Sequence, residues 1–473
     1  MAFPEHKTKI VATIGPASES PEILEQMIRV GMNVTRLNFS HGDFSTHRRV
    51  IQNIRRAAEA TGRRVAIMAD LPGPKMRIGT LVSEKVELKA GDRFTLTTEE
   101  IAGDQRRVSV TFSRLPLVVR AGDKLFLNDG YIQLEVVEVL GAEVVCLVKV
   151  GGELRSRKGL NLPGIDLGIS AFTERDRECL KFALESGVDA VSQSFVESAA
   201  DIQALRSAAG DLGYRPFVIA KIERTRALDR IDEILDAADG IMIARGDLGV
   251  EVPIERIAIL QKDLMRRANQ RAKPVITATQ MLESMTTNAL PTRAEATDVS
   301  NAILDGTDCV MLSAESATGR HPVESVAMLA RIAAAVEPTR RRVPVKEMYQ
   351  AAEIRGRVRP EHLVAIAVEA SLEYCSPLAV FTPTLSGASA RRMALLRLPV
   401  WTVAVSPIAK TCQDLLFSYG VMPVQEARRP PEWSLYVKAW LQKQGVSAGL
   451  AILTEGPCST DLNANHRMEI MEL

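Results

Sequence analysis

The chain has 473 residues, 46% of them hydrophobic, which is enough for about three domains, each with its own core. Its 59 Lys and Arg residues and 58 Asp and Glu residues give a net charge of +1. Such a balance provides no global field for nucleic acid or an anionic membrane, so any bound anion must be held by a local cluster of charges.

The chain contains six cysteines and no Cys-x-x-Cys pair, which favours buried reduced thiols over a zinc or redox site. No apolar run approaches the roughly 18 residues of a membrane span, and the first residues lack an apolar signal region. Aromatic residues make up only 4%, which argues against stacking on single-stranded nucleic acid. These features predict a cytoplasmic protein without nucleic-acid or membrane partners.

From residue 8 onward, short β-branched runs alternate with longer amphipathic stretches, which is typical of parallel strands joined by helices. Two helix starts are marked by Ser20 before a proline and by a capping-box pattern from Thr173 to Asp176. Eight strands of this kind suggest a closed (β/α)₈ barrel. The predicted strands lie near residues 9–14, 33–37, 65–69, 189–193, 217–221, 240–244, 274–278 and 308–312.

The segment 73–161 has a different character, with alternating strand patterns and tight-turn residues, and it predicts an inserted small β-barrel or sandwich. Residues 1–72 and 162–340 together have about the 250 residues that a (β/α)₈ barrel requires. Residues 341–473 again alternate strand and helix, with strands near 378–382, 400–405 and 449–453. We therefore predict an α/β protein: a TIM barrel, a β insert and a C-terminal open α/β domain.

Polar residues stand where nearly every predicted barrel strand ends, which is where barrel active sites are built. In chain order these residues are Thr13, Arg36, Asn38, Ser40, Asp70, Ser192, Ser194, Lys221, Glu223, Arg245, Asp247, Thr279, Gln280, Ser313 and Glu315.

Lys221 and Glu223 are two positions apart on one strand, so both side chains point to the same side. Asp247 follows the next strand and adds a second carboxylate beside Gly246, a residue that allows close approach to an anion. Two carboxylates suit Mg²⁺, which keeps waters and substrate oxygens among its ligands. With Arg36 and Arg77 as further cations, the set predicts a phosphate and metal site suited to phosphoryl transfer.

Each of these residues also has a structural alternative. Lys221 and Glu223 can form a buried salt bridge that braces the barrel, and Asp247 can be a turn residue between two glycines. A core ion pair between Arg36 and Asp70 is a further possibility. Thr279 and Ser313 are equally compatible with simple helix caps. His41, the only histidine beside a strand end, is interpreted as a packing or nucleotide-contacting residue and not as a base.

Several segments together resemble the pyruvate kinase family, in the family's order along the chain. They are residues 8–17 (TKIVATIGPA), 36–42 (RLNFSHG), 158–163 (KGLNLP), 220–223 (AKIE), 244–249 (ARGDLG), 278–285 (ATQMLESM) and 311–315 (MLSAE). The resemblance implies a Mg²⁺-dependent phosphotransferase, with Mn²⁺ as a substitute, that transfers the phosphoryl group of phosphoenolpyruvate to ADP and yields ATP and pyruvate at the last step of glycolysis. It also implies a homotetramer.

By this resemblance, Lys221 stabilises the transferring phosphoryl group, while Glu223 and Asp247 hold the metal. The backbone amides of Gly246 and Asp247, together with Thr279, would bind the substrate carboxylate. The proton donor to the enolate is the least assignable part, and we favour a water relay near Thr279 and Ser313.

The resemblance also implies residues that grip phosphate and nucleotide, and a lid whose closure excludes water. Arg36 and Arg77 would grip phosphate, and Asp129 on the insert would approach the nucleotide. The nucleotide-binding set is Asn38, His41, Arg77 and Lys158.

The chain departs from the family pattern where K⁺-dependent members hold the monovalent cation. Asn38, Ser40 and Asp70 are present, but Leu71 replaces a threonine and Lys75 occupies the position of a glutamate. A tethered ammonium beside Asp70 would supply the charge of the ion, so we predict activity without K⁺. The alternative is that Lys75 is a solvated hinge lysine. Two smaller departures are Glu197, where an arginine is common, and Arg226, where an acidic or amide residue is common.

In the C-terminal domain a predicted strand leads into a hydroxyl-rich turn at a helix start, a phosphate-binding arrangement that is similar to the effector loop of the family. Residues 456–460 are expected to face it, so the ligand would be a sugar phosphate or a nucleoside monophosphate, although an ordinary capped turn fits nearly as well. The predicted loop residues are Thr382, Thr384, Ser386, Gly387 and Ser389.

Two rival functions remain from the sequence alone. One is a carbon–carbon lyase acting on pyruvate-like enolates, which would need neither ADP nor a lid. The other is a metabolite sensor that has lost its chemistry, against which the intact Lys221, Glu223 and Asp247 argue.

Overall fold

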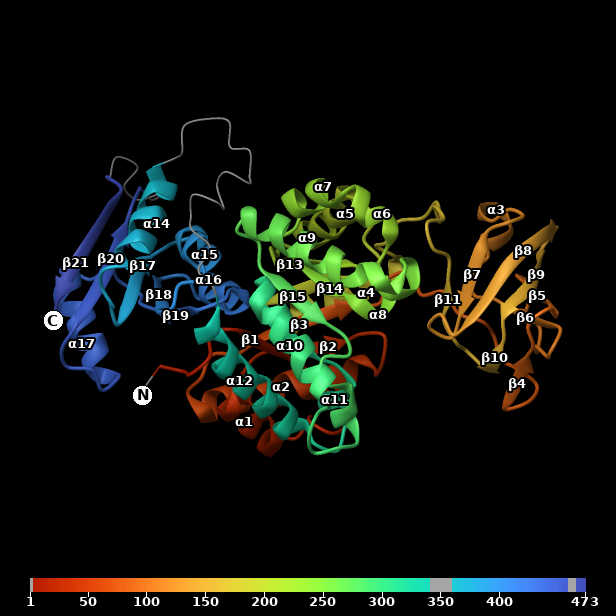
Figure 1. The fold of residues 1–473 in the computed structure, drawn as a ribbon, viewed down its shortest axis with the longest axis horizontal. Coiled ribbons are helices and arrows are strands. Elements are labelled where there is room, and N and C mark those ends of the chain that lie inside the picture. Colours follow the sequence, from red (N-terminus) through yellow and green to blue (C-terminus); the bar gives the residue numbers. More distant parts are fainter. Residues whose placement is uncertain (1–2, 341–359, 458–464) are drawn as a thin grey trace.

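The computed structural model describes residues 3–340, 360–457 and 465–473. Along the long axis of the molecule a barrel lies in the centre, a β-rich insert at one end and an α/β unit at the other (Figure 1). The predicted boundary between residues 340 and 341 borders a segment, 341–359, that lies outside the described residues. The other predicted domain boundaries stay predictions.

Eight of the described strands close into a parallel barrel in the order β1-β16-β15-β14-β13-β12-β3-β2, so the predicted (β/α)₈ barrel is confirmed. Each predicted barrel strand agrees with an observed one to within two residues at either end. The bounds are β1 Lys9–Thr13, β2 Met32–Asn38, β3 Ala66–Leu71, β12 Ala190–Gln193, β13 Phe217–Ile222, β14 Gly240–Ala244, β15 Val275–Ala278 and β16 Cys309–Leu312.

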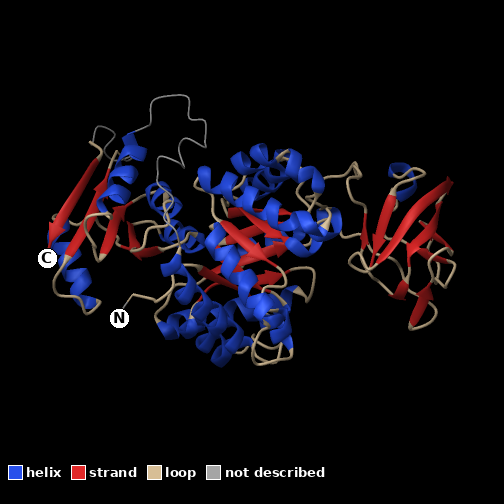
Figure 2. Cartoon of the chain, in the orientation of Figure 1, coloured by secondary structure: helices blue, strands red, loops and turns tan. Residues whose placement is uncertain are grey.

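Helices surround the barrel strands, as Figure 2 shows in blue around red. The first, α1, begins with Ser20 accepting a hydrogen bond from the Ile23 amide, and α4 begins with the predicted capping box between Thr173 and Asp176. The α-helices of the barrel unit are α1 Pro21–Val30, α2 Phe44–Thr61, α4 Glu174–Glu185, α5 Ala199–Asp211, α6 Thr225–Asp229, α7 Ile231–Ala237, α8 Arg245–Glu251, α9 Ile257–Gln270, α10 Arg293–Asp305, α11 Ala314–Ala317 and α12 Pro322–Val336. Short 3₁₀ turns lie between or after these elements: η1 Ile254–Arg256, η2 Glu283–Thr286 and η3 Glu337–Thr339.

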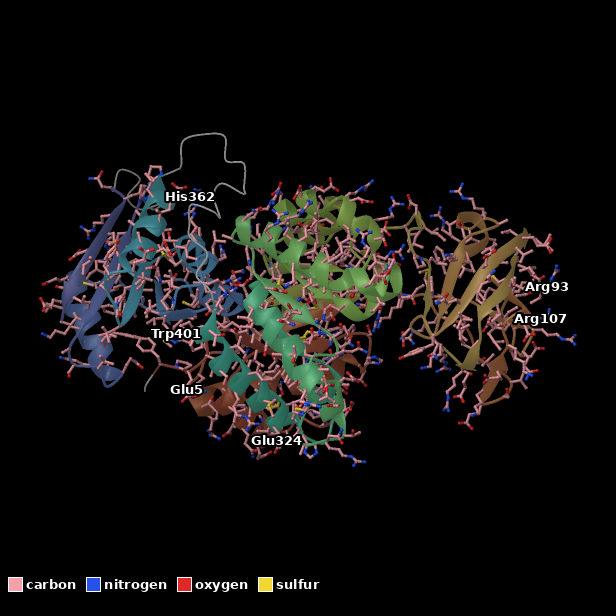
Figure 3. All side chains as sticks on the ribbon, viewed as in Figure 1. Glu5, Arg93, Arg107, Glu324, His362 and Trp401 are labelled. Carbon is pink, nitrogen blue, oxygen red and sulfur yellow. The ribbon has the colours of Figure 1, made fainter. Side chains whose placement is uncertain are left out.

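The insert connects β3 to the second part of the barrel and consists of two sheets around one apolar core that includes Phe94, Leu88 and Leu154. One sheet has the order β11-β7-β8-β9-β5-β6 and the other pairs β10 with β4. Of the two forms expected for the insert, two packed sheets describe it better than a closed barrel. Its bounds are β4 Lys85–Leu88, β5 Arg93–Thr97, β6 Arg107–Ser109, α3 Leu115–Val118, β7 Lys124–Leu127, β8 Ile132–Leu140, β9 Glu143–Val150, β10 Gly152–Arg155 and β11 Leu160–Asn161. Arg93 and Arg107 lie on its side away from the barrel (Figure 3).

The C-terminal unit has one sheet in the order β19-β18-β17-β20-β21, with β21 antiparallel to β20. Sequence analysis predicted three of these strands and missed the two at the edges, β19 and β21. The bounds are α14 Pro360–Ser371, β17 Ala379–Pro383, α15 Ala388–Leu395, β18 Trp401–Ser406, α16 Ala409–Asp414, η4 Leu415–Phe417, β19 Val421–Gln425, α17 Trp433–Lys443, β20 Leu450–Glu455 and β21 Arg467–Glu472.

The C-terminal unit closes the N-terminal end of the barrel with buried apolar and charged contacts. Phe417 is fully buried and stacks on Phe217 of β13, with ring centroids 5.2 Å apart. Beside it, the Arg397 guanidinium binds both carboxylate oxygens of Asp308, at 2.7 and 2.8 Å. This bidentate geometry fixes orientation as well as distance, so barrel and C-terminal unit are joined rigidly at this face.

Among the described helices, none is both long and apolar enough to cross a membrane.

Candidate active site

The C-terminal end of β13 places an ammonium and a carboxylate side by side. Lys221 Nζ lies 2.7 Å from Glu223 Oε1, and the side chain of Ile222 between them is buried in the core. The alternation of the strand therefore puts both charged groups on the inner side of the barrel mouth, as predicted.

Asp70, at the end of β3, is the carboxylate that gathers the cations of the site. Arg36 donates to its Oδ2 from Nε at 2.8 Å, Lys221 Nζ lies 3.6 Å from the same oxygen, and Ser192 Oγ donates to Oδ1 at 2.6 Å. Burial by itself would raise the pKa of Asp70, but Lys221, Arg36 and the Ser192 hydrogen bond outweigh it and hold the pKa at about 2. The ion pair between Arg36 and Asp70, offered above as a structural alternative, thus exists and is shared with Lys221.

Lys221 is held charged and in a fixed orientation. Its Nζ also donates to Ser194 Oγ at 2.7 Å, and that hydroxyl in turn donates to the Leu71 carbonyl at 2.7 Å. Burial lowers the pKa of Lys221, but Asp70 and Glu223 raise it more, so its pKa lies above the ordinary value. The ammonium is therefore a permanent positive charge at the barrel mouth.

Glu223 and Asp247 converge from neighbouring strands. Glu223 accepts a hydrogen bond from the Phe195 amide at 2.8 Å, which Phe195 can donate because it adopts a left-handed conformation with φ of 58°. Asp247 lies in the first turn of α8, where burial and the charge of Glu223 raise its pKa to about 6. Repulsion between two buried carboxylates is what a divalent cation between them would relieve, so this pair fits Mg²⁺.

Across the described ranges, no group of three or more His, Cys, Asp and Glu side chains converges in a way that would enclose a metal ion. A cation at Glu223 and Asp247 would therefore complete its shell with water or substrate oxygens, which is the preference of Mg²⁺.

Thr279 follows β15 in a left-handed conformation, with φ of 69°, and faces α8. Its Oγ1 donates to the Ala278 carbonyl at 2.6 Å and accepts from the Gly246 amide at 2.8 Å. Arg245 supports this loop by donating to the Thr279 carbonyl at 2.8 Å. The Gly246 amide predicted to bind substrate is thus already aimed at the Thr279 hydroxyl, and a ligand there would share or replace that hydrogen bond.

Ser313 follows β16 at the same rim of the barrel. Its amide donates to Glu315 Oε2 at 2.7 Å, and Glu315 Oε1 accepts from the Leu282 amide at 3.1 Å. Within the described chain, the Ser313 side chain makes no capping hydrogen bond to α11, which removes the support for a simple helix cap.

Lys75, Arg77 and His41 share the outer part of the mouth. Desolvation and the charges of Lys221 and Arg77 lower the pKa of Lys75, while Asp70 raises it, so these groups are electrostatic neighbours. His41 is exposed at the surface. Its pKa is lowered mainly by the loss of some surrounding water and secondly by the positive charges of Lys75 and Arg77.

The remaining predicted residues lie partly on the barrel and partly on the insert. Asn38 lies opposite Asp70 in the barrel register and accepts from the Ser40 amide at 3.1 Å. On the insert, Arg77 Nη1 donates to the Arg157 carbonyl at 2.8 Å, and the half-buried Lys158 follows directly. Asp129, exposed with φ of 56°, is close enough to Asp247 to raise its pKa further.

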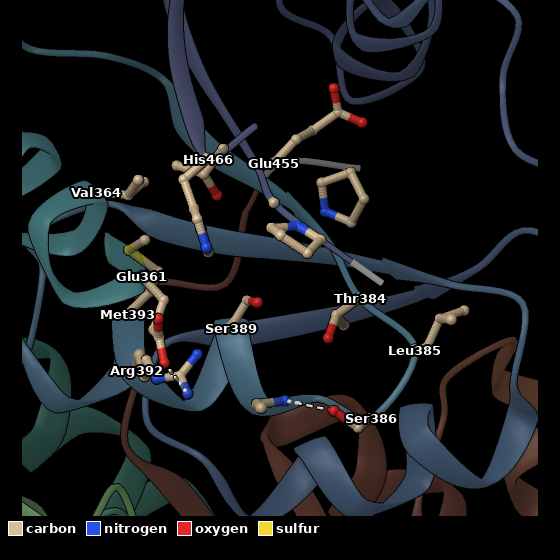
Figure 4. Close-up of a pocket in the computed structure, with 15 residues that line it drawn as sticks. Glu361, Val364, Thr384, Leu385, Ser386, Ser389, Arg392, Met393, Glu455 and His466 are labelled. Carbon is tan, nitrogen blue, oxygen red and sulfur yellow. Dashed lines mark hydrogen bonds and ion pairs between the residues drawn. The ribbon is translucent and has the colours of Figure 1, made fainter. Parts of the chain in front are cut away.

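The C-terminal unit holds a cavity of about 490 Å³ beside the predicted effector loop (Figure 4). Thr384, Ser386 and Ser389 line it, together with Arg392, which lies 3.5 Å from Glu361. Gly387 adopts φ of 81° and its amide donates to Thr384 Oγ1 at 3.0 Å, so the loop turns tightly into α15. The buried hydroxyl of Thr382, on β17, pairs instead with Thr454 at 3.1 Å and is not among the lining residues.

One residue of the predicted effector loop, Thr382, lies away from the cavity. Thr382 is a core residue of the sheet because its strand lies between β18 and β20. Of residues 456–460, Gly456 and Pro457 line the cavity, while 458–460 lie outside the described residues.

Sequence reasoning missed several groups that shape the site. Ser192 and Ser194 were noted at a strand end, but their roles toward Asp70 and Lys221 depend on packing between strands. No sequence signal marks the left-handed Phe195 amide. Arg224, next to Glu223, is a further residue of this region that the sequence analysis does not predict.

Fold and site together define a (β/α)₈ barrel whose mouth brings Lys221 and Arg36 together with the carboxylates of Asp70, Glu223 and Asp247, and which carries a domain inserted after β3. Comparisons with known proteins specify the family. A family model of the pyruvate kinase barrel domain matches residues 5–326.

Curated relatives and a solved structure agree along most of the chain. Pyruvate kinase of Thermococcus litoralis is 48% identical over 89% of this chain and 89% of its own, and pyruvate kinase of Thermotoga maritima is 40% identical over 95% and 96%. The crystal structure of a pyruvate kinase from Cryptosporidium parvum has a TM-score of 0.91 and 34% identity, covering 99% of this chain and 96% of that one. The chain belongs to the pyruvate kinase family.

We expect Asp70→Asn to lower the free energy of unfolding at pH 7 by about 3–5 kcal/mol, because it leaves the buried Arg36 and Lys221 without their carboxylate. Asp263→Asn is the control: it alters ion pairs whose side chains are 35% to 51% exposed, and it should change the free energy of unfolding by less than about 1 kcal/mol. Urea denaturation measures both. Equal midpoints for Asp70→Asn and the unaltered protein would contradict the central role of this carboxylate.

The difference in unfolding stability between Asp70→Asn and the unaltered protein should depend on pH, with a sign that the pKa of Asp70 fixes. Because the folded pKa of Asp70 is about 2, below its ordinary 3.8, the stabilisation from its charge is complete above about pH 4 and is lost as the pH falls toward 2. The stability difference between Asp70→Asn and the unaltered protein should therefore shrink through this window.

Proposed function

We propose that this enzyme transfers the phosphoryl group of phosphoenolpyruvate to ADP, giving ATP and enolpyruvate, which is then protonated to pyruvate. The observation that carries the proposal is the arrangement of Lys221 and Arg36 around one buried carboxylate beside a pair of metal-type carboxylates. Family membership supplies the substrates by name. As a glycolytic enzyme it would act in the cytoplasm.

The cations of the site act on the charge that spreads over the phosphoryl oxygens during transfer. Lys221 is fixed by Asp70, Glu223 and Ser194, so its ammonium needs no reorganisation when that charge develops. Arg36 is anchored to Asp70 through Nε and to Thr13 Oγ1 through Nη1, at 3.0 Å. Phosphoryl transfer needs positioning and charge neutralisation more than covalent help, and these two residues supply both.

Glu223 and Asp247 are proposed to hold Mg²⁺, with Mn²⁺ as a substitute. When bound, such an ion supplies further positive charge to the phosphoryl and carboxylate oxygens of the substrate. The chain contributes the two carboxylates, and the hydrogen bond from the Phe195 amide at 2.8 Å keeps Glu223 in place.

The substrate carboxylate is proposed to lie between α8 and the loop after β15, at Gly246, Asp247 and Thr279. The Gly246 amide and the Thr279 hydroxyl already face each other at 2.8 Å, so both can turn toward an incoming anion. Thr279 and Ser313 are proposed to deliver the proton to the enolate through water.

The insert is proposed to act as a lid for ADP, with Asn38, His41, Arg77 and Lys158 contacting the nucleotide. Asp129 is near enough to influence Asp247, which supports an approach of the insert to the mouth. Closure would exclude water, so that the phosphoryl group passes to ADP and not to solvent.

Activity is proposed to be independent of K⁺. Lys75 is an electrostatic neighbour of Asp70, Asp247 and Lys221, which is the region where its ammonium could replace a monovalent cation. Asn38, Ser40 and Leu71 complete this region, but the Leu71 side chain is buried and offers no oxygen from its side chain.

The cavity in the C-terminal unit is proposed to bind a phosphorylated activator, either a sugar phosphate or a nucleoside monophosphate. Three hydroxyl-bearing residues, Thr384, Ser386 and Ser389, line it at the start of α15, where helix amides point toward an anion. Behind the loop, Thr411 Oγ1 donates to the Leu385 carbonyl at 2.6 Å. A homotetramer is proposed from the family, and light scattering of the purified protein tests it.

A carbon–carbon lyase on the same scaffold is disfavoured because the chain matches pyruvate kinases over nearly its whole length, including the insert. A sensor without chemistry is disfavoured because Lys221, Glu223 and Asp247 lie together at the barrel mouth.

The reaction is tested by measuring ADP-dependent pyruvate formation from phosphoenolpyruvate. Lys221→Met should lower kcat by at least about 10²–10³-fold, because it removes the fixed charge at the transferring group. Lys181→Met is the matched control and should keep full activity, because Lys181 only forms an exposed ion pair with Glu185 on α4, at 4.0 Å. Full turnover by Lys221→Met, or no turnover by the unaltered protein, would refute the proposal.

Independence of K⁺ is tested by assaying turnover in buffers that contain neither sodium nor potassium. The unaltered enzyme should be fully active, whereas Lys75→Glu should lose about tenfold or more and recover with KCl, since an oxygen ligand then replaces the ammonium. Lys85→Glu, at an exposed pair on the insert, should respond to neither change. Many-fold activation of the unaltered enzyme by KCl would contradict the role of Lys75.

The effector loop is tested by titrating sugar phosphates and nucleoside monophosphates while following the substrate dependence. An activator should lower the phosphoenolpyruvate concentration at half-maximal rate, and a Ser386→Ala, Ser389→Ala double variant should weaken its binding by about tenfold, because two hydroxyl donors at the anion are lost. Ser434→Ala, at the start of α17, is the control. An unchanged response in the double variant would leave the loop with a structural role only.

A further inference from the structure

Two residues that differ from the usual family pattern, Glu197 and Arg226, are partners in the folded chain. Arg226 Nε lies 3.2 Å from Glu197 Oε2, and Arg226 Nη1 lies 2.7 Å from Asp166, a residue just after the last strand of the insert. The two departures are therefore complementary, and the pair they form is attached to the connection through which the insert rejoins the barrel.

Arg224 is the inner and fully buried part of the same network. Its Nη2 donates to the carbonyls of Leu162 and Ile165, at 3.3 and 2.9 Å, and also lies 3.3 Å from Glu197 Oε1. Its side chain is only 2% exposed. One guanidinium thus holds the backbone of the returning connection at two points.

The other side of the Arg224 guanidinium faces α8. Arg224 Nη1 lies 3.5 Å from Glu251 Oε1, and Glu251 is the last residue of the helix whose first turn carries Gly246 and Asp247. Glu251 Oε2 accepts from the Thr225 amide at 3.2 Å. Arg224 also directly follows Glu223 in the chain, so it adjoins one of the two carboxylates that fit the metal and contacts the helix that carries the other.

The contact between Arg224 and Glu251 is ionic and incompletely hydrogen-bonded. Glu251 is 1% exposed, and burial raises its pKa while Arg224 opposes that rise. Within the described residues, Arg224 Nε and Glu251 Oε1 are buried without a hydrogen-bond partner. Two buried charged groups that lie close together but still have free hydrogen-bonding atoms can form a shorter or a longer contact after a small movement, because those free atoms can still gain a partner.

We infer that Arg224 is a positioning residue that couples the orientation of the insert to the placement of Glu223 and α8. When the segment 162–165 moves with the lid, the planar guanidinium moves with the two carbonyls it holds and carries the end of α8 through Glu251. Glu197, Arg226 and Asp166 form the outer half of this coupling. The inference deepens the proposed function, since it gives lid closure a mechanical route to the residues that bind substrate and metal.

The test compares Arg224→Lys with Arg206→Lys in the full-length enzyme. Lysine keeps the charge but cannot span two carbonyls and two carboxylates, because it lacks the planar five-donor fork. Arg206 is a matched control because it too binds a carbonyl, that of Ala237 at 3.0 Å, and a carboxylate, that of Asp239 at 2.7 Å, away from the connection. The measurements are kcat for phosphoenolpyruvate and ADP, and hydrogen exchange over residues 160–168 and 245–251.

Arg224→Lys is expected to lower kcat by about tenfold to a hundredfold, because small displacements of positioned groups have effects of this size. It should also speed hydrogen exchange about tenfold in both segments, whereas Arg206→Lys leaves kcat and both segments unchanged. The inference is overturned if Arg224→Lys resembles the control, or if its kcat falls while exchange in the two segments stays the same.

If Arg224→Lys does not fold, the coupling is tested with Glu251→Gln. This change preserves the shape of the side chain and removes only the charge that faces Arg224. The same two changes are then expected, and their absence rejects the coupling. An unaltered enzyme without pyruvate kinase activity would refute the proposed function alone, because the exchange measurement does not depend on turnover.

Discussion

A single buried carboxylate, that of Asp70, determines where the charges of the barrel mouth lie. Its two oxygens bind Arg36, Lys221 and Ser192, which come from three other strands of the barrel. Two cations in a nearly dry environment would repel each other without it, and a buried charge that loses its partner costs several kcal/mol. The anion-binding character of the mouth therefore depends on a residue that is not itself placed to touch the substrate.

The insert is tied to this mouth at both of its connections. The outgoing connection turns at Gly73, with φ of 65°, where an added Cβ would lie 2.8 Å from the Phe195 ring. The returning connection is held by Arg224. Phe195 also supplies the amide that fixes the Glu223 carboxylate, and Arg224 directly follows Glu223 in the chain, so each connection contacts a residue adjacent to Glu223 in space or in sequence. If the insert acts as the proposed lid, a change in its position would therefore be transmitted to Glu223.

The C-terminal unit is joined at the opposite end of the barrel. Thr411 contacts the loop of the cavity, and η4, which follows it closely, inserts Phe417 among the apolar side chains inside the barrel. A ligand in the cavity and a substrate at the mouth would thus act on two ends of one packed core. Because cores are dense, small displacements at one end can be felt at the other.

The barrel is predictable from the order of residues alone, because eight buried runs alternate with capped helices in the pattern typical of parallel strands joined by helices. The sequence by itself also placed Lys221 and Glu223 on one side of a strand, since the alternation of a strand is local. It missed β19, whose Pro423 is unfavourable in a central strand but tolerated at the edge where the sheet ends. Only tertiary structure decided that Asp70 is shared by two cations, that Phe195 donates to Glu223, and that Glu197 and Arg226 are partners, because each joins segments whose proximity depends on strand register and on the position of the insert.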